Sequence, residues 1–194
     1  MSSPPTGQPS QAKAGDAKPA RRFAQLPIGL NQCEPMYSIK FQGEDDDPGV
    51  SLYKFLRFGN CGGPEEESEE ARYCVGLNKP LGPGNSYGYL VHKMEWPAYK
   101  PDRPALCFCY DTTTRYELGH EIALDWCDYL AKAMRLLDPE ASVDGRDERN
   151  PVVGGIEFKQ MYLSEFYAND WREWESKIWV ELPDGMENLD FLVR

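Results

Sequence analysis

The chain has 194 residues, a hydrophobic fraction of 41% and a formal net charge of −11 at pH 7. This length fits one domain with or without a tail, and the apolar content excludes a chain that is disordered throughout. No apolar run reaches the roughly 18 residues of a membrane-spanning helix. The negative charge argues against direct binding to nucleic acid or to an anionic membrane.

The six cysteines predict reduced thiols rather than a disulfide framework. We expect no secretory signal, because the N-terminus lacks an apolar leader, and a cytoplasmic protein keeps its thiols reduced. No Cys-x-x-Cys pair is present, so the spacing indicates neither a thioredoxin motif nor a zinc ribbon. Cys107 and Cys109 flank a phenylalanine in an apolar run, and Cys127 falls on the apolar face of an expected helix. We expect these three thiols to be buried.

Residues 1–30 predict a flexible, Pro-rich, mildly basic tail, and residues 31–194 predict a single domain. Five prolines among many Ser, Gln, Ala and Gly residues leave the tail too little apolar surface to offset its ordering entropy. The end of the tail holds a segment that we expect to dock onto the domain, marked by Phe23, Leu26, Ile28 and Leu30.

Alternation of apolar and polar residues predicts strands in the first half of the domain. They cover residues 36–42, 50–58, 72–77 and 87–94. Residues 43–49 are expected to join the first two strands as a hairpin, and a Pro- and Gly-rich stretch joins the second pair. The continuous apolar run 105–110 predicts a central strand.

A long amphipathic helix is predicted from Thr114 to about Leu137. Thr114-Arg-Tyr-Glu117 has the capping-box pattern, and apolar residues then recur at i, i+3, i+4 and i+7 as far as Asp138-Pro139.

The C-terminal part predicts two more strands, at 156–163 and 178–182, with a short helix between them. Ser164 is expected to cap that helix, because Tyr167, Trp171 and Trp174 recur at helical spacing. The sum is an α+β fold, an antiparallel or mixed sheet of about six to seven strands covered by one long and one short helix.

Two acidic runs hold most of the charge imbalance. The first is Glu44-Asp45-Asp46-Asp47; the second contains Glu65, Glu66, Glu67, Glu69 and Glu70. They flank the expected strand 50–58, one at each end. One interpretation is solvated loops that aid solubility. The other is electrostatic recognition of a basic protein, a nucleic-acid-binding protein or the chain's own basic tail, which its tether holds at high effective concentration.

Aromatic residues are the second candidate interface material. Trp171, Trp174 and Trp179 lie close together in the sequence, and Trp96 lies in a Pro-rich stretch. Core burial is the usual role of such rings, whereas exposed rings form interface hot spots. We therefore expect partner contacts at the two acidic runs and at Trp96, Trp171 and Trp174.

Histidine is scarce, and His120 is the centre of a candidate metal or hydrolase site. The cluster around the expected start of the long helix contains Asp111, Glu117, His120, Glu121 and Asp125. Carboxylates spaced i, i+4 share one stripe that can bind a divalent ion, although the second His of an HExxH motif is absent. A solvated helix face near a positive N-terminus is the alternative interpretation.

His92 offers a different hypothesis, a cysteine nucleophile at Cys107 or Cys109 on a neighbouring strand. That chemistry needs an exposed thiol of lowered pKa beside the imidazole. The apolar surroundings favour inert core thiols instead. No GxGxxG or GxxxxGK[ST] motif is present.

The sequence thus predicts a cytoplasmic, non-enzymatic protein-interaction domain of inhibitor, immunity or adaptor type. Its expected partner is a protein with a basic surface, no cofactor is expected, and a homo-oligomer remains open. One alternative is a small metal-dependent hydrolase that uses His120, Glu121 and Asp125. Another is a structural or assembly subunit with a flexible arm.

Overall fold

The computed structural model describes 20–27, 35–43, 46–58, 88–96, 99, 105–109, 113–137, 150–169 and 173–189. For 57–58, 88–89 and 106–109 it describes the backbone alone. Glu44, Asp45, Asp111, Trp171 and the run 65–70 lie outside the described residues, as does the expected strand 72–77.

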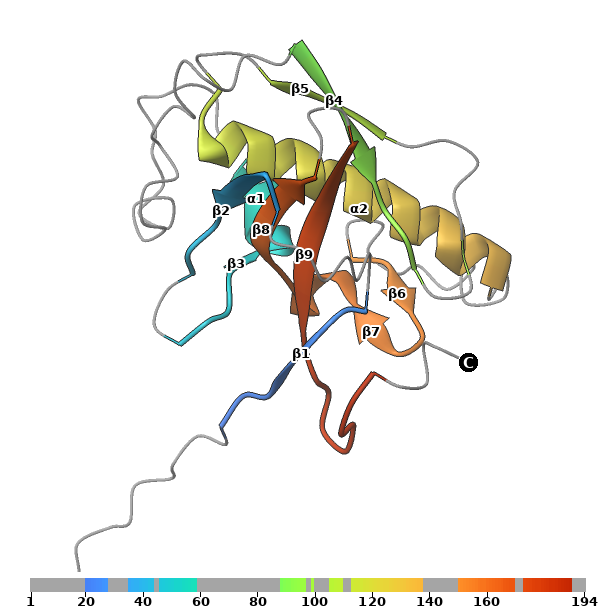
Figure 1. Ribbon diagram of the computed structural model, residues 1–194. Coiled ribbons are helices and arrows are strands. Elements are labelled where there is room, and N and C mark those ends of the chain that lie inside the picture. Colours follow the sequence, from blue (N-terminus) through green and yellow to red (C-terminus); the bar gives the residue numbers. More distant parts are fainter. Residues whose placement is uncertain are drawn as a thin grey trace, which may run out of the picture.

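A seven-stranded mixed sheet forms one layer of the fold (Figure 1). The strand order is β2-β8-β9-β4-β5, while β1 pairs with β9 and β3 pairs with β8. All these pairs are antiparallel except β4 with β9. The strands are β1 (Phe23–Gln25), β2 (Tyr37–Lys40), β3 (Val50–Ser51), β4 (Gly88–Lys93), β5 (Ala105–Cys109), β8 (Met161–Ala168) and β9 (Glu173–Glu181). A small second sheet pairs β6 (Val152–Val153) with β7 (Ile156–Glu157).

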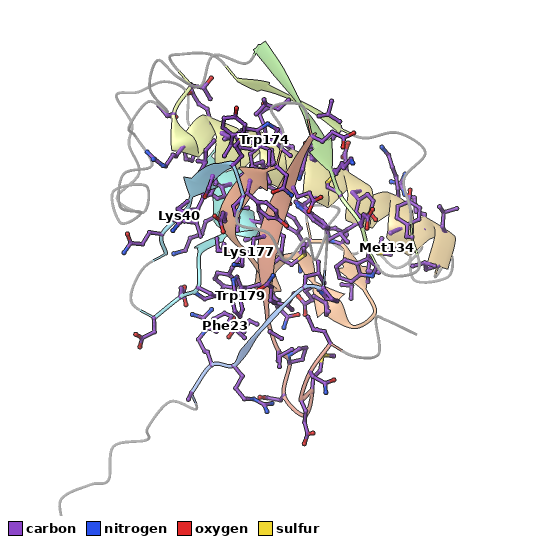
Figure 2. The ribbon with its side chains drawn as sticks, viewed as in Figure 1. Phe23, Lys40, Met134, Trp174, Lys177 and Trp179 are labelled. Atoms are coloured by element: carbon purple, nitrogen blue, oxygen red, sulfur yellow. The ribbon has the colours of Figure 1, made fainter. Side chains whose placement is uncertain are left out.

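Strand β1 confirms that the segment around Phe23 and Leu26 docks onto the domain. Phe23 lies opposite Glu181 on β9, and Leu26 is buried in the core. Figure 2 shows the side chains of Phe23 and Trp179 at the same end of β9. Part of the stretch expected as a tail therefore belongs to the main sheet.

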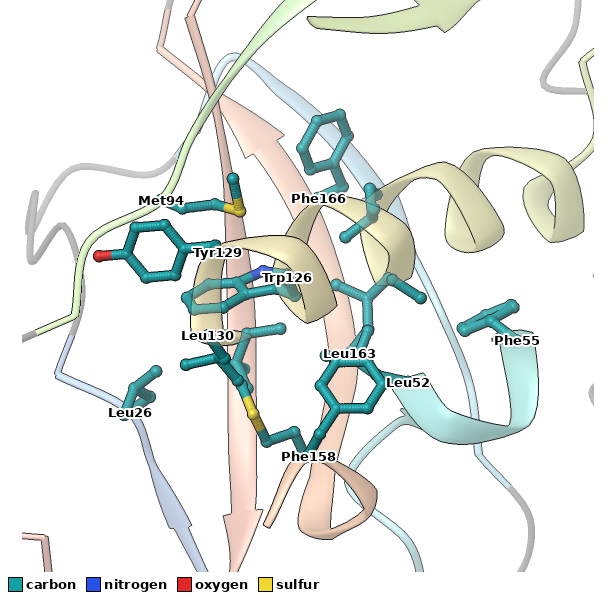
Figure 3. Packing of buried hydrophobic residues seen from close by; sticks show 14 of the residues in the cluster. Leu26, Leu52, Phe55, Met94, Trp126, Tyr129, Leu130, Phe158, Leu163 and Phe166 are labelled. Atoms are coloured by element: carbon teal, nitrogen blue, oxygen red, sulfur yellow. The ribbon is translucent and has the colours of Figure 1, made fainter. Parts of the chain in front are cut away.

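Helix α2 (Arg115–Leu137) confirms the predicted long helix and its cap. The Thr114 amide donates to Glu117 Oε2 at 2.7 Å, and the Glu117 amide donates to Thr114 Oγ1 at 3.1 Å. The apolar stripe of α2 covers one face of the sheet, and Figure 3 shows Trp126, Tyr129 and Leu130 over β8 and β9. The α+β class, with one long and one short helix, is confirmed.

The short helix lies elsewhere in the chain than expected. Residues 50–58 do not form one strand, because β3 ends at Ser51 and helix α1 (Leu52–Phe58) follows directly. The apolar residues in this run satisfy a helical period as well as a strand period. Leu52 and Phe55, three residues apart, are both fully buried, and α1 contacts α2. The local sequence pattern is compatible with a helix and with a strand, and contact with α2 favours the helix.

The expected helix over 164–176 is wrong, because β8 and β9 form an antiparallel hairpin there. Phe166, Trp174, Ser176 and Ile178 face inward with the period of a strand. A register shift between Leu163 and Glu165 adds one residue to β8 and breaks the alternation there.

Three other expectations also change. Strands β2 and β3 each pair with β8 and not with each other, so the hairpin expected between them does not form. The apolar run that begins at Ala105 forms β5 at the end of the main strand path, not at its centre. The expected strand 156–163 is interrupted by a 3-10 turn, η2 (Phe158–Gln160), between β7 and β8. Among the described residues, no helix is both long and apolar enough to cross a membrane.

We expect Gly119→Ala to destabilise the fold where the two helices touch. A Cβ at position 119 would lie 2.4 Å from the Phe55 ring, which is fully buried and has little room to move. Overpacking costs about 1–3 kcal/mol, and alanine's better helix propensity returns at most about 1 kcal/mol. Urea unfolding should therefore show a net loss. The loss should shrink in a Phe55→Leu background, and an equal loss in both backgrounds would contradict this explanation.

Candidate functional site

A chain of four polar side chains crosses the core between α2 and the sheet. His92 Nδ1 lies 3.0 Å from Asp125 Oδ2, and His92 Nε2 lies 3.0 Å from Ser176 Oγ. Trp126 Nε1 donates to the same Ser176 oxygen at 2.7 Å. The side chains come from β4, β9 and α2, and both His92 and Ser176 are buried.

One arrangement of protons satisfies every group in this chain. Trp126 can only donate, so Ser176 accepts from it and directs its own hydroxyl proton to His92 Nε2. A neutral His92 then carries its proton on Nδ1 and donates to Asp125. Fully paired polar groups in a dry core avoid the cost of burying unsatisfied donors. The chain therefore joins α2 to β4 and β9.

The order carboxylate, imidazole, hydroxyl is that of a serine-hydrolase triad, but the surroundings differ. Ser176 lies in mid-strand beneath α2 with 2% of its surface exposed. Its oxygen already accepts a hydrogen bond from Trp126. A nucleophile needs an accessible oxygen and donors aimed at the developing oxyanion. This arrangement suits structural linkage.

The same contacts bear on the cysteine-nucleophile hypothesis. Cys107 lies on β5 opposite Leu90, and Cys109 lies opposite Gly88, so both are on the strand next to His92. Both ring nitrogens of His92 are instead engaged by Asp125 and Ser176.

Ser176 was missed by sequence reasoning, although it left a signal. It is the one polar residue among the inward positions Trp174, Ile178 and Val180 of β9. On β4, His92 is likewise the polar residue at an inward position, between Leu90 on the strand and Met94 just after it. Two polar residues at inward positions of neighbouring strands indicate a shared hydrogen bond.

Ser176→Ala should lower the free energy of unfolding by about 1–3 kcal/mol, because it leaves Trp126 Nε1 and His92 Nε2 buried without their partner. The matched control is Ser38→Ala on β2, since the Ser38 hydroxyl donates to Glu165 at an exposed position and should contribute less than about 0.5 kcal/mol. Chemical denaturation of both variants makes the comparison. Equal effects would show that the buried network adds no stability.

The candidate metal residues on α2 serve separate contacts. His120 Nδ1 lies 2.9 Å from the Phe55 carbonyl oxygen, and its ring stacks on Tyr116. Asp125 is instead directed to His92. Five helical positions separate His120 from Asp125, which places them about 140° apart around the axis. Among the described residues, no three His, Cys, Asp or Glu side chains form a group able to hold a metal ion.

A second polar cluster surrounds Arg21, beside β1. The Arg21 guanidinium donates to both carboxylate oxygens of Glu181 at 2.7 Å. It also donates to Asp47 Oδ1 at 2.5 Å and to the Tyr162 hydroxyl. Its central carbon lies 5.0 Å from the centre of the Phe23 ring and 5.3 Å from that of Tyr162. We call Asp47, Tyr162 and Glu181 the arginine site.

The arginine site combines partial burial with two carboxylates that interact with positive charge. The hydrogen bond to Glu181 raises the pKa of Arg21 above its usual value. Burial raises the pKa of Asp47, while the attraction of Arg21 and Lys54 opposes that rise. Burial also raises the pKa of Tyr162 to about 12. Asp47 and Glu181 both accept hydrogen bonds from Arg21, and Lys54 adds a second positive charge near Asp47, so loss of Arg21 removes a hydrogen-bonded cation from both carboxylates.

The first acidic run therefore has a partner inside the chain. Among the alternatives considered for that run was the basic tail, and Arg21 of that stretch binds Asp47. Asp46 beside it is exposed. Trp96 and Trp174, also expected at an interface, are core residues with 3% and 1% of their surface exposed. Their burial leaves no open ring for a partner.

Comparison with other proteins adds no assignment. No protein-family model, curated protein or solved structure matches this chain. Inference about function therefore rests on the residues themselves, and above all on the arginine site.

The raised pKa of Tyr162 predicts a loss of stability in alkali. Folding favours the protonated hydroxyl of Tyr162. Its contribution to the free energy of unfolding is therefore complete below pH 10 and is lost as the pH rises toward about 12. Tyr162→Phe has no group to ionise there. Its unfolding free energy should fall less steeply than that of the wild type between these pH values. Parallel curves would contradict the assignment.

Proposed function

We propose that this chain is a non-enzymatic protein-interaction domain of inhibitor, immunity or adaptor type, which binds a basic segment of a partner protein. The observation that supports this proposal most is the arginine site. Asp47, Tyr162 and Glu181 already hold a guanidinium in this fold. The proposed setting is the cytoplasm.

The chemistry of the site favours arginine over other cations. Glu181 accepts two hydrogen bonds from the planar fork of Arg21, an arrangement that the ammonium group of lysine cannot reproduce. The side chains of Asp47 and Glu181 are 20% and 28% exposed. Partial burial reduces solvent screening, so the charge selects a partner better than a fully exposed acidic loop would.

The acidic runs bear on the rate at which the chain associates with a basic partner. Asp46 and Asp47 belong to the first run, and a concentration of negative charge raises the rate at which a basic partner arrives. The contacts of His92 and His120 within the fold give further support, because both imidazoles stabilise helix contacts. Neither the catalytic nor the metal hypothesis gains a comparable observation.

An assembly subunit with an N-terminal arm is the second candidate, and β1 is the observation that favours it. An extended terminal segment paired to a sheet edge is the element that protomers exchange in swapped oligomers. This candidate predicts a defined oligomer whose formation depends on residues 20–27.

The proposed function predicts charge-specific binding at one place. The starting protein is the full chain with Arg21→Ala, which removes the resident guanidinium. Adding Asp47→Asn and Glu181→Gln should weaken binding of a fluorescent octa-arginine peptide about tenfold or more, measured by fluorescence anisotropy. The control adds Asp128→Asn and Glu187→Gln, which change the net charge equally. It should weaken binding less than about threefold.

Salt dependence provides the second readout of the same experiment. Loss of two carboxylates at the arginine site should flatten the decline of affinity with salt more than loss of the two control carboxylates. Equal affinities and equal salt slopes in the two variants would mean that the peptide senses net charge alone, which would refute the proposal. Circular dichroism checks that each variant is folded.

A further inference from the structure

The edge of β9 beside the arginine site has the properties of an edge that binds an extended strand. Strand β8 pairs with one side of β9 along its length. On the other side β4 pairs only with Glu173–Glu175, and β1 pairs with Trp179–Glu181. Within the described part of the chain, β1 is thus the element that covers this half of the edge.

Backbone hydrogen bonds on this edge are independent of side-chain identity. Besides the ladder between β1 and β9, the Leu26 amide donates to the Ile178 carbonyl and the Leu182 amide donates to the Arg22 carbonyl, each at 2.8 Å. Pairing of an added strand gives affinity, while pockets for alternate side chains give specificity. Any extended segment can satisfy the first requirement.

Specificity comes from the side chains of residues 20–27, which alternate between the two faces of the sheet. Arg21 and Phe23 lie on the outer face, where Phe23 meets Tyr162 edge to face at 5.3 Å. Ala24 packs against the core on the inner face, and Leu26 is buried there with 1% exposed. The recognised pattern is therefore arginine, any residue, an aromatic residue, and an aliphatic residue three positions later.

We infer that this β9 edge binds an extended segment of a partner protein with the pattern Arg-x-aromatic-x-x-aliphatic, and that residues 20–27 are its resident competitor. The inference rests on the proposed function and names its partner chemistry. The resident strand has only three residues, and its charged contacts are partly exposed. A short edge strand held in this way opens at lower free energy than the central hairpin.

The charge left behind explains why an incoming segment needs arginine. Departure of Arg21 removes the guanidinium from Asp47, from Glu181 and from the Tyr162 hydroxyl, which itself donates to Glu181 at 3.3 Å. An incoming guanidinium restores both ion pairs and the double hydrogen bond. A lysine restores the charge alone and should bind less tightly.

The test adds a fluorescent peptide copy of residues 20–27 to the full chain. The wild type should bind it weakly, because the tethered copy competes at high effective concentration. Arg21→Ala with Phe23→Ala weakens the tethered copy and should tighten binding of the peptide about tenfold or more. Equal affinity for the two proteins overturns the inference.

Peptide variants test the pattern itself on the Arg21→Ala, Phe23→Ala chain. A scrambled peptide of the same composition should not bind, and lysine in place of the first arginine should weaken binding several-fold. Scrambled and native peptides that bind alike would overturn the inference. If the octa-arginine experiment still distinguishes its two variants, the proposed function survives that outcome.

Two further outcomes are decisive. If the double variant unfolds below the assay temperature, Arg21→Lys replaces it. This variant keeps the charge but loses the double hydrogen bond of the guanidinium, so it should still bind the peptide more tightly than the wild type does. An unchanged affinity in Arg21→Lys would count against the inference. The second outcome is concentration-dependent dimers of the wild type, seen by light scattering, that dissociate when the peptide is added. That result would make a second copy of the chain the occupant of the β9 edge and would overturn the assignment of a partner protein.

Discussion

Burial of the apolar face of α2 on the sheet is the constraint on which the rest of the fold depends. Trp126 brings an indole N–H into that interface, and this donor needs an acceptor in a dry core. Ser176 supplies it and also hydrogen-bonds His92 Nε2, while His92 Nδ1 reaches Asp125 on the helix. One chain of hydrogen bonds thereby fixes the position of α2 against β4 and β9. Its geometry resembles a catalytic relay, but its burial makes it a structural link.

The arginine site stands in contrast to this buried network. Its two carboxylates are partly exposed, and Arg21, which they bind, precedes a three-residue strand near the start of the described chain. A charged cluster of this kind contributes little net stability, because desolvation offsets much of the attraction between the charges. Under the proposed function it contributes selectivity instead, since a forked cation satisfies Asp47, Tyr162 and Glu181 together. The proposal thus assigns stability to the contact between α2 and the sheet, and recognition to the end of β9.

The sequence predicts one kind of element well and another poorly, for physical reasons. Helix α2 was predictable because its capping box and its apolar stripe agree over 23 residues. The β8–β9 hairpin was not, because a register shift near Ser164 breaks the alternation and Ser176 interrupts an otherwise apolar face. Helix α1 was mistaken for a strand, since local periodicity does not include the contact of Phe55 with α2. Charge patterning identified the first acidic run, with the basic tail as one of its possible partners. It did not identify the roles of Tyr162 and Glu181.

The central claim is that β1 is a detachable ligand of the sheet, held at the arginine site. Native-state amide hydrogen exchange tests it most directly at Leu26 and Leu182, whose amides bond across the β1–β9 edge. The account predicts that these two amides exchange through a local opening well below the global unfolding free energy, and faster as salt screens Arg21. Exchange of both amides only through global unfolding, with no dependence on salt, would contradict it.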